Sequence, residues 1–363
     1  MNNFSEKIIQ ILNHGALNLA LGMGYSHGIF DVMDDLGEPA TIPALAKATD
    51  LDKRYLKEWL GIMVTGNIIE MSNNEKGEET FLLPPAHADV LTTRAGNQNL
   101  GVYTQEIPLL TACAMEPVSK GFSTGKGVAF SHYPSFQAFM SELSNAKHRQ
   151  VLIQEFLPSV DNGRMVERLK QGIQVCDLGC GQGVALNLMA RAFPDSSFLG
   201  IDNHQDAIEE ARVSAREMNL MNASFTVLDA GKIEGKTDFY QKFDYVCAFD
   251  AIHDQSHPLQ ALKGIHYMLK PRGVFSMIDI KAATSLTENL DHPMGPFLYT
   301  VSLMHCMPVG LNYNGRGLGM MWGKEQALAL LKQAGFDQVD AVEIPNDPFN
   351  LHFLCRPRAD AAL

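Results

Sequence analysis

The segment from Val175 to Gly183, which reads VCDLGCGQG, constrains the fold of this chain more than any other part of the sequence. An apolar run ends in three alternating glycines, an amphipathic helical pattern follows, and a second apolar run ends at Asp202. Glycines at a strand-to-helix turn let the backbone approach a ligand without interference from a Cβ atom. The acid, 23 positions after Gly179, is placed to accept hydrogen bonds from both ribose hydroxyls. The pattern predicts half of a nucleotide-type site.

The glycine spacing indicates which nucleoside is bound. A dinucleotide site reads G-x-G-x-x-G and holds a pyrophosphate, whereas this chain reads G-x-G-x-G and has Val184 at the third dinucleotide position. Asp177, just before the glycines, suits a cationic ligand and repels a pyrophosphate. Residues 177–183 resemble the first motif of class I S-adenosylmethionine-dependent methyltransferases. An incidental strand–glycine–helix turn is the alternative, which the acid at Asp202 disfavours.

The remainder of the C-terminal half fits an α/β fold. Apolar runs at 224–228, 243–249 and 274–280 alternate with helical patterns, which predicts a parallel sheet covered on both faces. Two final runs, 339–344 and 350–355, resemble the reversed hairpin that closes the Rossmann-like, seven-stranded methyltransferase sheet. The resemblance covers roughly Asp161 to the C-terminus.

The N-terminal part predicts three helices, at 26–36, at 41–48 and from Asp52, followed by two short strands. This order is that of a winged helix-turn-helix. Residues 52–60 and the hairpin resemble the N-terminal domain of small-molecule O-methyltransferases, which implies a homodimer and a wall of the substrate pocket. We expect three parts: a winged-helix and dimerisation domain at 1–95, a helical linker and substrate lid at 96–160, and a class I methyltransferase domain at 161–363.

Charge argues against a nucleic-acid partner. The chain has a net charge of −12, and residues 1–95 contain seven Lys and Arg against thirteen acids. The wing carries Glu75, Glu78 and Glu79, which a DNA backbone would repel. A transcriptional regulator that binds S-adenosylmethionine and reads DNA is the alternative function, and methylation of RNA is a third.

The cysteines and the apolar runs indicate the setting of the protein. The six cysteines contain no C-x-x-C pair, so we expect no disulfide, no zinc or other metal, and a reducing cytoplasm. No apolar run is long enough to span a bilayer, and the helical pattern at 4–21 lacks the basic start of a signal peptide.

Methyl transfer to a hydroxyl oxygen needs a base, and His253 is the candidate. It follows the fourth predicted strand, at the edge where ligands bind in open α/β folds. His253 and Asp254 match the catalytic His followed by Asp of plant-like O-methyltransferases. That family continues with an aromatic residue where this chain has Gln255, so lining of the pocket or capping of the next helix are alternative roles.

The family resemblance also implies a set of donor-binding residues at strand ends. The glycines give close approach, Asp177 lies near the amino group, Asp202 holds the ribose, Asp229 and Ala230 contact the adenine edge, and Asp250 or Phe249 contacts the methionine side. The candidates for S-adenosyl-L-methionine are Asp177, Gly179, Gly181, Gly183, Asp202, Asn203, Asp229, Ala230, Phe249 and Asp250.

The acceptor is expected to be a small amphipathic molecule. A glycine-rich loop at 119–133 and a segment at 299–322 mix aromatic area with polar groups. The candidates for acceptor binding are His132, Tyr133, Tyr299, His305, Cys306, Tyr313 and Trp322. Ordinary core packing is the alternative for each of them. The sequence does not identify the acceptor or the methylated atom.

Overall fold

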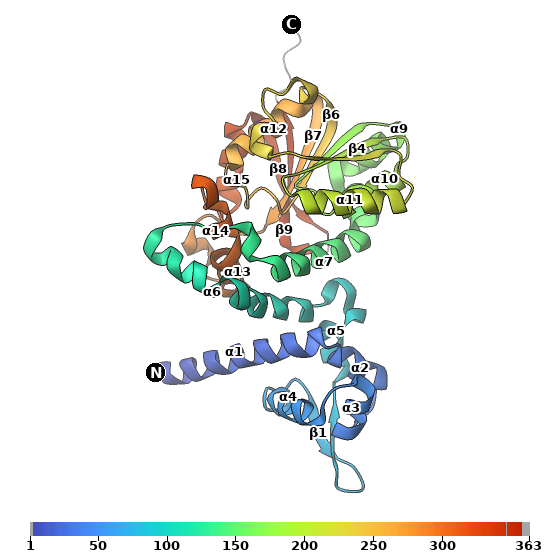
Figure 1. The fold of residues 1–363 in the computed structure, drawn as a ribbon, viewed down its shortest axis with the longest axis vertical. Coiled ribbons are helices and arrows are strands. Elements are labelled where there is room, and N and C mark those ends of the chain that lie inside the picture. The colour runs from blue at the N-terminus through green and yellow to red at the C-terminus, as the bar shows by residue number, and fades with distance from the viewer. Residues whose placement is uncertain (1–2, 346, 358–363) are drawn as a thin grey trace. The chain divides into compact units, whose positions relative to one another are not determined.

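The computed structural model describes residues 3–345 and 347–357 (Figure 1). They divide into two compact units that meet between Ala112 and Cys113. The three-part division at residues 95 and 160 stays a prediction. None of the described helices is both long enough and apolar enough to cross a membrane.

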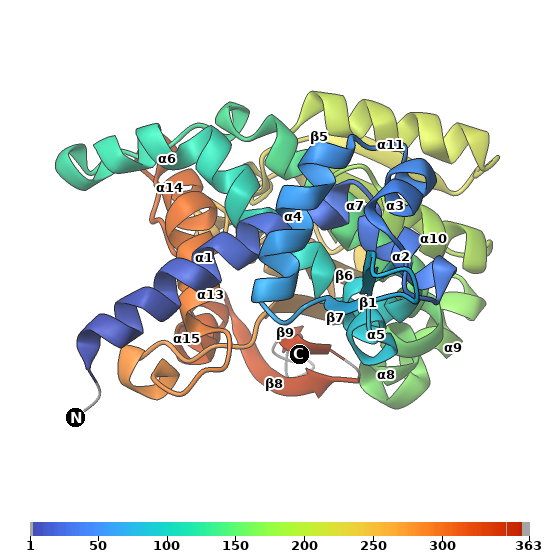
Figure 2. The same cartoon turned by 90° about the horizontal axis from the view of Figure 1, so that it is seen from below.

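The N-terminal unit has the predicted winged helix-turn-helix. Its elements are α1 (Phe4–Ser26), α2 (Ile29–Leu36), α3 (Ile42–Thr49), α4 (Lys53–Thr65), β1 (Glu70–Asn73), β2 (Glu79–Leu82) and α5 (Pro85–Leu91). Helix α4 begins where the Asp52 carboxylate accepts the backbone N–H of Arg54 at 2.8 Å. Its apolar face buries Leu56 and Leu60. The indole of Trp59 donates to the carbonyl of Ala20 at 2.8 Å. This bond joins α4 to α1, and the two helices lie against each other (Figure 2).

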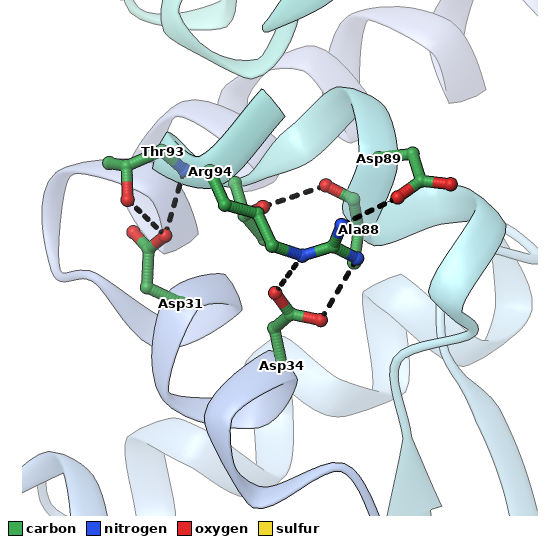
Figure 3. A network of polar contacts seen from close by, with 7 residues as sticks. Asp31, Asp34, Ala88, Asp89, Thr93 and Arg94 are labelled. Atoms are coloured by element: carbon green, nitrogen blue, oxygen red, sulfur yellow. Dashed lines mark hydrogen bonds and ion pairs between the residues drawn. The ribbon is translucent and has the colours of Figure 1, made fainter. Parts of the chain in front are cut away.

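A polar network joins α2 to the segment after α5 (Figure 3). Arg94, in the 3₁₀ turn η1 (Thr93–Gln98), pairs with Asp34 on α2 and with Asp89 on α5. The hydroxyl and the backbone N–H of Thr93 both donate to Oδ1 of Asp31, at 2.7 and 2.8 Å. These contacts fix the chain where it leaves the winged helix.

The C-terminal unit contains a seven-stranded sheet in the order β5-β4-β3-β6-β7-β9-β8. The strands are β3 (Gln174–Leu178), β4 (Ser197–Asp202), β5 (Ala223–Val227), β6 (Phe243–Phe249), β7 (Leu269–Ile280), β8 (Phe336–Ile344) and β9 (Asp347–Pro357). The first five are parallel, β9 runs antiparallel to β7, and β8 runs antiparallel to β9. The predicted α/β class and the closing hairpin are confirmed.

Apolar residues bury both faces of this sheet. One cluster packs α12 (Pro258–Met268) and α15 (Lys324–Gln333) against the sheet. The other packs α9 (Arg164–Gln171), α10 (Val184–Ala192) and α11 (Gln205–Glu217) on the opposite side (Figure 1). Two covered faces explain why the strands read as continuous apolar runs and not as alternating patterns.

The segment before the sheet differs from expectation. The sequence predicts separate helices at 134–143 and 147–157, but a single helix α7 (Pro134–Val151) continues into a π-helical turn, η4 (Leu152–Phe156). The polar residues between the two predicted helices include no glycine or proline, so nothing there ends a helix. Helix α6 (Glu106–Thr124) likewise extends into the expected loop. Asn145 on α7 donates to the side chain of Gln182 in the glycine turn at 3.0 Å.

Candidate active site

The three glycines after β3 all adopt positive φ angles, of 75°, 50° and 71° at Gly179, Gly181 and Gly183. Their surroundings differ. A Cβ at Gly179 would lie 2.5 Å from the Cβ of Ala251, and one at Gly183 would lie 2.6 Å from the ring of Phe225. A Cβ at Gly181 would meet no atom within 4 Å. Two glycines therefore serve packing within the fold, while Gly181 faces space that a ligand can take.

Asp202, at the end of β4, holds the glycine turn in place. One carboxylate oxygen accepts the backbone N–H of Gly181 at 2.9 Å, and the other accepts that of His204 at 2.9 Å. A carboxylate oxygen has further lone pairs, so each can still accept a hydroxyl. The neighbouring Asn203 is exposed.

Asp177 lies inside the sheet beneath the turn. It is 2% exposed, and burial raises the pKa of its carboxyl to about 7. The thiol of Cys247 on β6 donates to one of its oxygens at 3.6 Å. A nearby cation would therefore stabilise the ionised carboxylate of Asp177. Its contact with an amino group stays a prediction.

Asp250 follows β6 with a positive φ of 49°, which is uncommon for a residue with a side chain. Its Oδ1 is buried and has no hydrogen-bond partner among the described residues. Burial raises the pKa of this carboxyl to about 6, although Lys147 opposes the effect. A strained residue with an orphaned acceptor indicates a position that a ligand completes.

The other predicted donor residues have structural partners. Asp229 accepts the backbone N–H of Gly231 at 2.9 Å and caps the 3₁₀ turn η6 (Ala230–Lys232), in which Ala230 is buried. Phe249 packs its ring edge-on against His148, at a centroid distance of 4.9 Å, and against Phe156. These contacts place Phe249 within the apolar layer beside α7.

His253 and Asp279 form a buried pair on neighbouring strand ends. His253 follows β6, is 4% exposed, and has its Nδ1 2.8 Å from Oδ1 of Asp279 near the end of β7. The same oxygen accepts the indole N–H of Trp322 at 3.1 Å and the backbone N–H of Ile280 at 2.8 Å. Three donors converge on one oxygen, which fixes the Asp279 carboxylate and, through it, the imidazole ring.

The pair sets the chemical state of the imidazole. Because Asp279 accepts from Nδ1–H, Nε2 is left as the atom that can take a proton. Burial alone would lower the pKa of His253, but the nearby carboxylates of Asp279 and Asp254 outweigh it and raise that pKa well above its usual value. Nε2 lies 3.4 Å from Oδ1 of Asp254. The arrangement makes His253 a strong base whose protonated form is stabilised by two acids.

A second group of predicted residues gathers around His305. His305 and Cys306 lie in a π-helical turn, η9 (Ser302–Cys306), between α13 (Gly295–Val301) and α14 (Met307–Gly310). The rings of Tyr133 and Phe136 each lie 4.8 Å from the His305 ring. Its Nε2 is buried and has no hydrogen-bond partner among the described residues. Burial lowers the pKa of His305, so a neutral imidazole lines an aromatic wall.

The structure does not bring all predicted acceptor residues to this place. The side chain of Tyr313 is 81% exposed, and His132 is exposed as well. The hydroxyl of Tyr299 accepts from the amide of Asn289 at 3.1 Å, and its ring packs in a small separate cluster. Tyr133, by contrast, is buried and donates its hydroxyl to the carbonyl of Met304 at 2.8 Å.

Asp279 is the functional candidate that sequence reasoning missed. The apolar run at 274–280 predicts a strand, and Asp279 lies within it. A carboxylate in such a run has a high desolvation cost. An acid that occupies a buried strand end beside the histidine loop was the available signal. Only the strand order, which places β7 next to β6, shows that it meets His253.

Comparison with known proteins agrees with this architecture. Residues 169–335 match the family described as "Methyltransferase domain", and residues 15–94 match the "Rv2258c-like winged HTH domain". The ubiquinone biosynthesis O-methyltransferase of Roseobacter denitrificans is 26% identical over 175 residues, which are 47% of this chain and 62% of that protein. The chain therefore spans less than two thirds of the length of this relative.

Solved structures extend the similarity to nearly the whole chain. Human N-acetylserotonin methyltransferase in complex with SAM superimposes with a TM-score of 0.66, at 16% identity and 98% coverage of both chains. The mitomycin 7-O-methyltransferase gives a TM-score of 0.65, at 16% identity and 97% coverage of both chains. At these identities the likeness shows a shared fold.

Proposed function

We propose that this chain, which joins a methyltransferase domain to a winged helix-turn-helix domain, transfers a methyl group from S-adenosylmethionine to a hydroxyl oxygen of a small molecule. The observation that carries the proposal is the His253–Asp279 pair at the carboxyl edge of the sheet, one strand from the glycine turn. A strong base beside a nucleoside site is what methylation of a hydroxyl requires.

The donor-side residues fit a cationic nucleoside. When bound, S-adenosylmethionine supplies a methyl group already activated by its positive sulfonium. Gly181 leaves room for close approach, Asp202 presents its carboxylate at the turn, and Asp250 presents an unpaired buried oxygen. We assign the remaining predicted donor contacts, Asp177, Asp229 and Ala230, to the same ligand. All four acids favour a positive charge nearby, which suits this donor.

On the acceptor side, His253 removes the hydroxyl proton. The proton moves from the acceptor oxygen to Nε2, while Nδ1–H stays hydrogen-bonded to Asp279. The oxygen keeps the electron pair with which it attacks the methyl carbon. The imidazolium that forms is stabilised by the carboxylates of Asp279 and Asp254. His253 is the catalytic base in this mechanism, and Asp279 is the residue that positions it.

The aromatic wall indicates the class of acceptor. Tyr133, Phe136 and the neutral His305 offer flat apolar surface with one unpaired nitrogen. This combination suits a planar molecule that carries a hydroxyl group and one further polar group. The names of the relatives, among them ubiquinone biosynthesis and mitomycin 7-O-methyltransferases, support an oxygen as the methylated atom.

The proposal includes a homodimer in the cytoplasm. Helix α1 exposes Phe4, Ile8, Leu12, Leu19 and Met23, which fall on one helical face. An apolar stripe of this length suits association with a second copy. The cytoplasmic part of the proposal rests on the cysteine pattern of the sequence, in which no C-x-x-C pair occurs.

DNA is not a partner in this proposal. Arg54, on the helix that would enter the groove, is paired with Glu58 on the same helix. The wing carries Glu75 and Glu78 between β1 and β2, and Glu79 at the start of β2. Phosphate contacts require cations that this surface does not offer in excess.

A two-part experiment tests the function. Calorimetry with S-adenosylhomocysteine measures the donor site, and incubation with methyl-labelled donor and a panel of hydroxylated aromatic compounds measures transfer. We expect saturable binding and a methyl ether as product, identified by mass spectrometry. Failure to bind the nucleoside would refute the donor site, whereas labelled product with methyl on nitrogen or carbon would refute the hydroxyl acceptor.

A further inference from the structure

His253, Asp254 and Cys306 form a compact group of metal-ligand side chains. Their ligand atoms, Nε2, a carboxylate oxygen and Sγ, all lie within 4.8 Å of one another. Within the described parts of the chain, no other group of three His, Cys, Asp or Glu side chains meets this condition. His253 and Cys306 are each 4% exposed, and the side chain of Asp254 is 27% exposed, so the group is mostly buried and is not a surface cluster of acids.

The separation of the nitrogen and oxygen ligands is that of a tetrahedral zinc site. Ligand nitrogen and oxygen atoms about 2.1 Å from zinc are about 3.4 Å apart at the tetrahedral angle. The distance from Nε2 of His253 to Oδ1 of Asp254 is 3.4 Å. That oxygen is buried and makes no hydrogen bond with any described residue, so it is available as a ligand. The Sγ of Cys306 lies within 4.8 Å of both other ligand atoms and 3.6 Å from Nδ1 of His305, so the thiol has to turn toward His253 and Asp254 to complete three ligands.

Asp279 provides the outer support that such sites have. Metal-bound histidines usually donate their other ring N–H to a carboxylate, which orients the ring and raises its basicity. Here Nδ1 of His253 lies 2.8 Å from Asp279, whose own position is fixed by Trp322. The imidazole therefore already presents Nε2 to Asp254 and Cys306.

The charges also balance. With Cys306 as thiolate, Asp254 as carboxylate and His253 neutral, the three ligands carry two negative charges, which match a divalent cation. The thiol proton, and any proton on Nε2, leave to solvent as the metal binds. Sulfur, nitrogen and oxygen together favour a borderline-soft ion over magnesium or calcium.

We propose that His253, Asp254 and Cys306 bind Zn²⁺ with one coordination position left open, and that this ion inhibits methyl transfer. Zinc takes the lone pair of Nε2, so the metal and the acceptor proton compete for the same atom. Inhibition therefore rests on the function proposed above, whereas binding of the metal does not. The sequence concealed this site because Cys306 lies far from the His-Asp pair in the chain.

The test uses Co²⁺ as a spectroscopic substitute on the full-length protein without donor. We expect one equivalent of Co²⁺ to give a thiolate-to-cobalt charge-transfer band and the visible bands of tetrahedral cobalt, both of which Zn²⁺ removes. The charge-transfer band should disappear in Cys306→Ser. It should persist in Cys355→Ser, an equally buried thiol on β9. Asp279→Asn should weaken binding by about ten- to a hundredfold.

The outcomes separate this inference from the proposed function. Absence of the thiolate band in the wild-type protein, or its survival in Cys306→Ser, would overturn the zinc site whatever the enzyme does. If either cysteine variant unfolds, as judged by circular dichroism, His253→Gln serves in its place and should lose the tetrahedral cobalt spectrum. Zinc that binds at this site and leaves turnover unchanged would overturn inhibition alone.

Discussion

Nδ1 of His253 lies 2.8 Å from Oδ1 of Asp279 and joins the loop after β6 to the end of β7. Asp279→Asn keeps the shape but replaces the anion that holds the imidazole and stabilises its protonated form. We expect turnover to fall by about 10²- to 10⁴-fold, the usual contribution of a general base, with His253→Ala equally impaired. Donor affinity should stay unchanged in both variants. Steady-state kinetics and calorimetry measure the two effects.

Trp322→Phe is the matched control for this prediction. It removes the hydrogen bond from the indole of Trp322 to the same Asp279 oxygen and leaves the His253–Asp279 pair in place. Its loss of turnover should be clearly smaller. If Asp279→Asn and Trp322→Phe slow the reaction equally, or if His253→Ala retains turnover with the true substrate, the base assignment is wrong.

Asp202 is expected to bind the ribose as well as the glycine turn. Asp202→Ala should lose detectable donor binding, but it also removes the acceptor for the N–H of Gly181. Asp202→Asn retains one oxygen for that contact and loses the charge. We expect its donor Kd to rise by about ten- to a hundredfold, as for loss of a hydrogen bond to a charged group. Unchanged affinity by calorimetry would contradict the ribose assignment.

Gly181 and Gly183 provide a matched pair of substitutions. Alanine at either position has to adopt a positive φ, which lowers the free energy of unfolding by about 1–2 kcal/mol. A Cβ at Gly183 also meets Phe225 at 2.6 Å and Ala211 at 2.7 Å, whereas one at Gly181 meets nothing. Gly183→Ala should therefore lower the free energy of unfolding by about a further 1–3 kcal/mol, and Tm should fall with it. Gly181→Ala should keep more stability yet bind the donor more weakly, and the reverse pattern would exclude Gly181 from the site.

The buried Asp177 predicts a pH dependence of stability. Its pKa is about 7 in the folded protein against 3.8 for the free side chain, so between these values the unfolded chain binds fewer protons. Stability should then fall as pH rises from 4 to 7 and level off above, by about 4 kcal/mol at most. Urea unfolding at several pH values should show Asp177→Asn more stable than wild type at pH 8 and equal near pH 4. A constant difference would contradict this.

The exposed face of α1 predicts the oligomeric state. A stable dimer buries about 800 Å² on each partner, and a charge within that area is costly. Leu12→Glu should give a monomer in light scattering coupled to size-exclusion chromatography. Gln10→Glu adds the same charge on the opposite helical face and should remain dimeric. A monomeric wild type, or dissociation of both variants, would refute an interface on this face.

The sequence predicted most of the fold, because the fold depends on local patterns, whereas the assignment of the donor-binding residues stays a prediction. Glycine spacing, strand ends and alternating elements are readable within short windows, and the parallel sheet with its closing hairpin followed from them. Helix limits were less accurate. The sequence predicts separate helices at 134–143 and 147–157, although α7 runs through residues 144–146 without a break.

The acceptor side was harder to predict because its contacts join distant segments. His305 meets Tyr133, which immediately precedes α7 far earlier in the chain, and Asp279 meets His253 across neighbouring strands. Tyr313 lies in the same aromatic-rich segment as the other candidates, but its side chain is exposed to solvent. No periodicity distinguishes these cases, since the turn η9 and the strand order decide which side chains converge.

The glycine turn follows β3 and is held by Asp202 at the end of β4, whereas the aromatic wall comes from Tyr133, α7 and the helical segment of residues 295–310. On the function proposed above, different stretches of the chain therefore bind the methyl donor and the acceptor. Replacing residues 295–310 with those of a relative should therefore change which acceptor is methylated while the nucleoside site stays intact. The two sites can change independently within one fold.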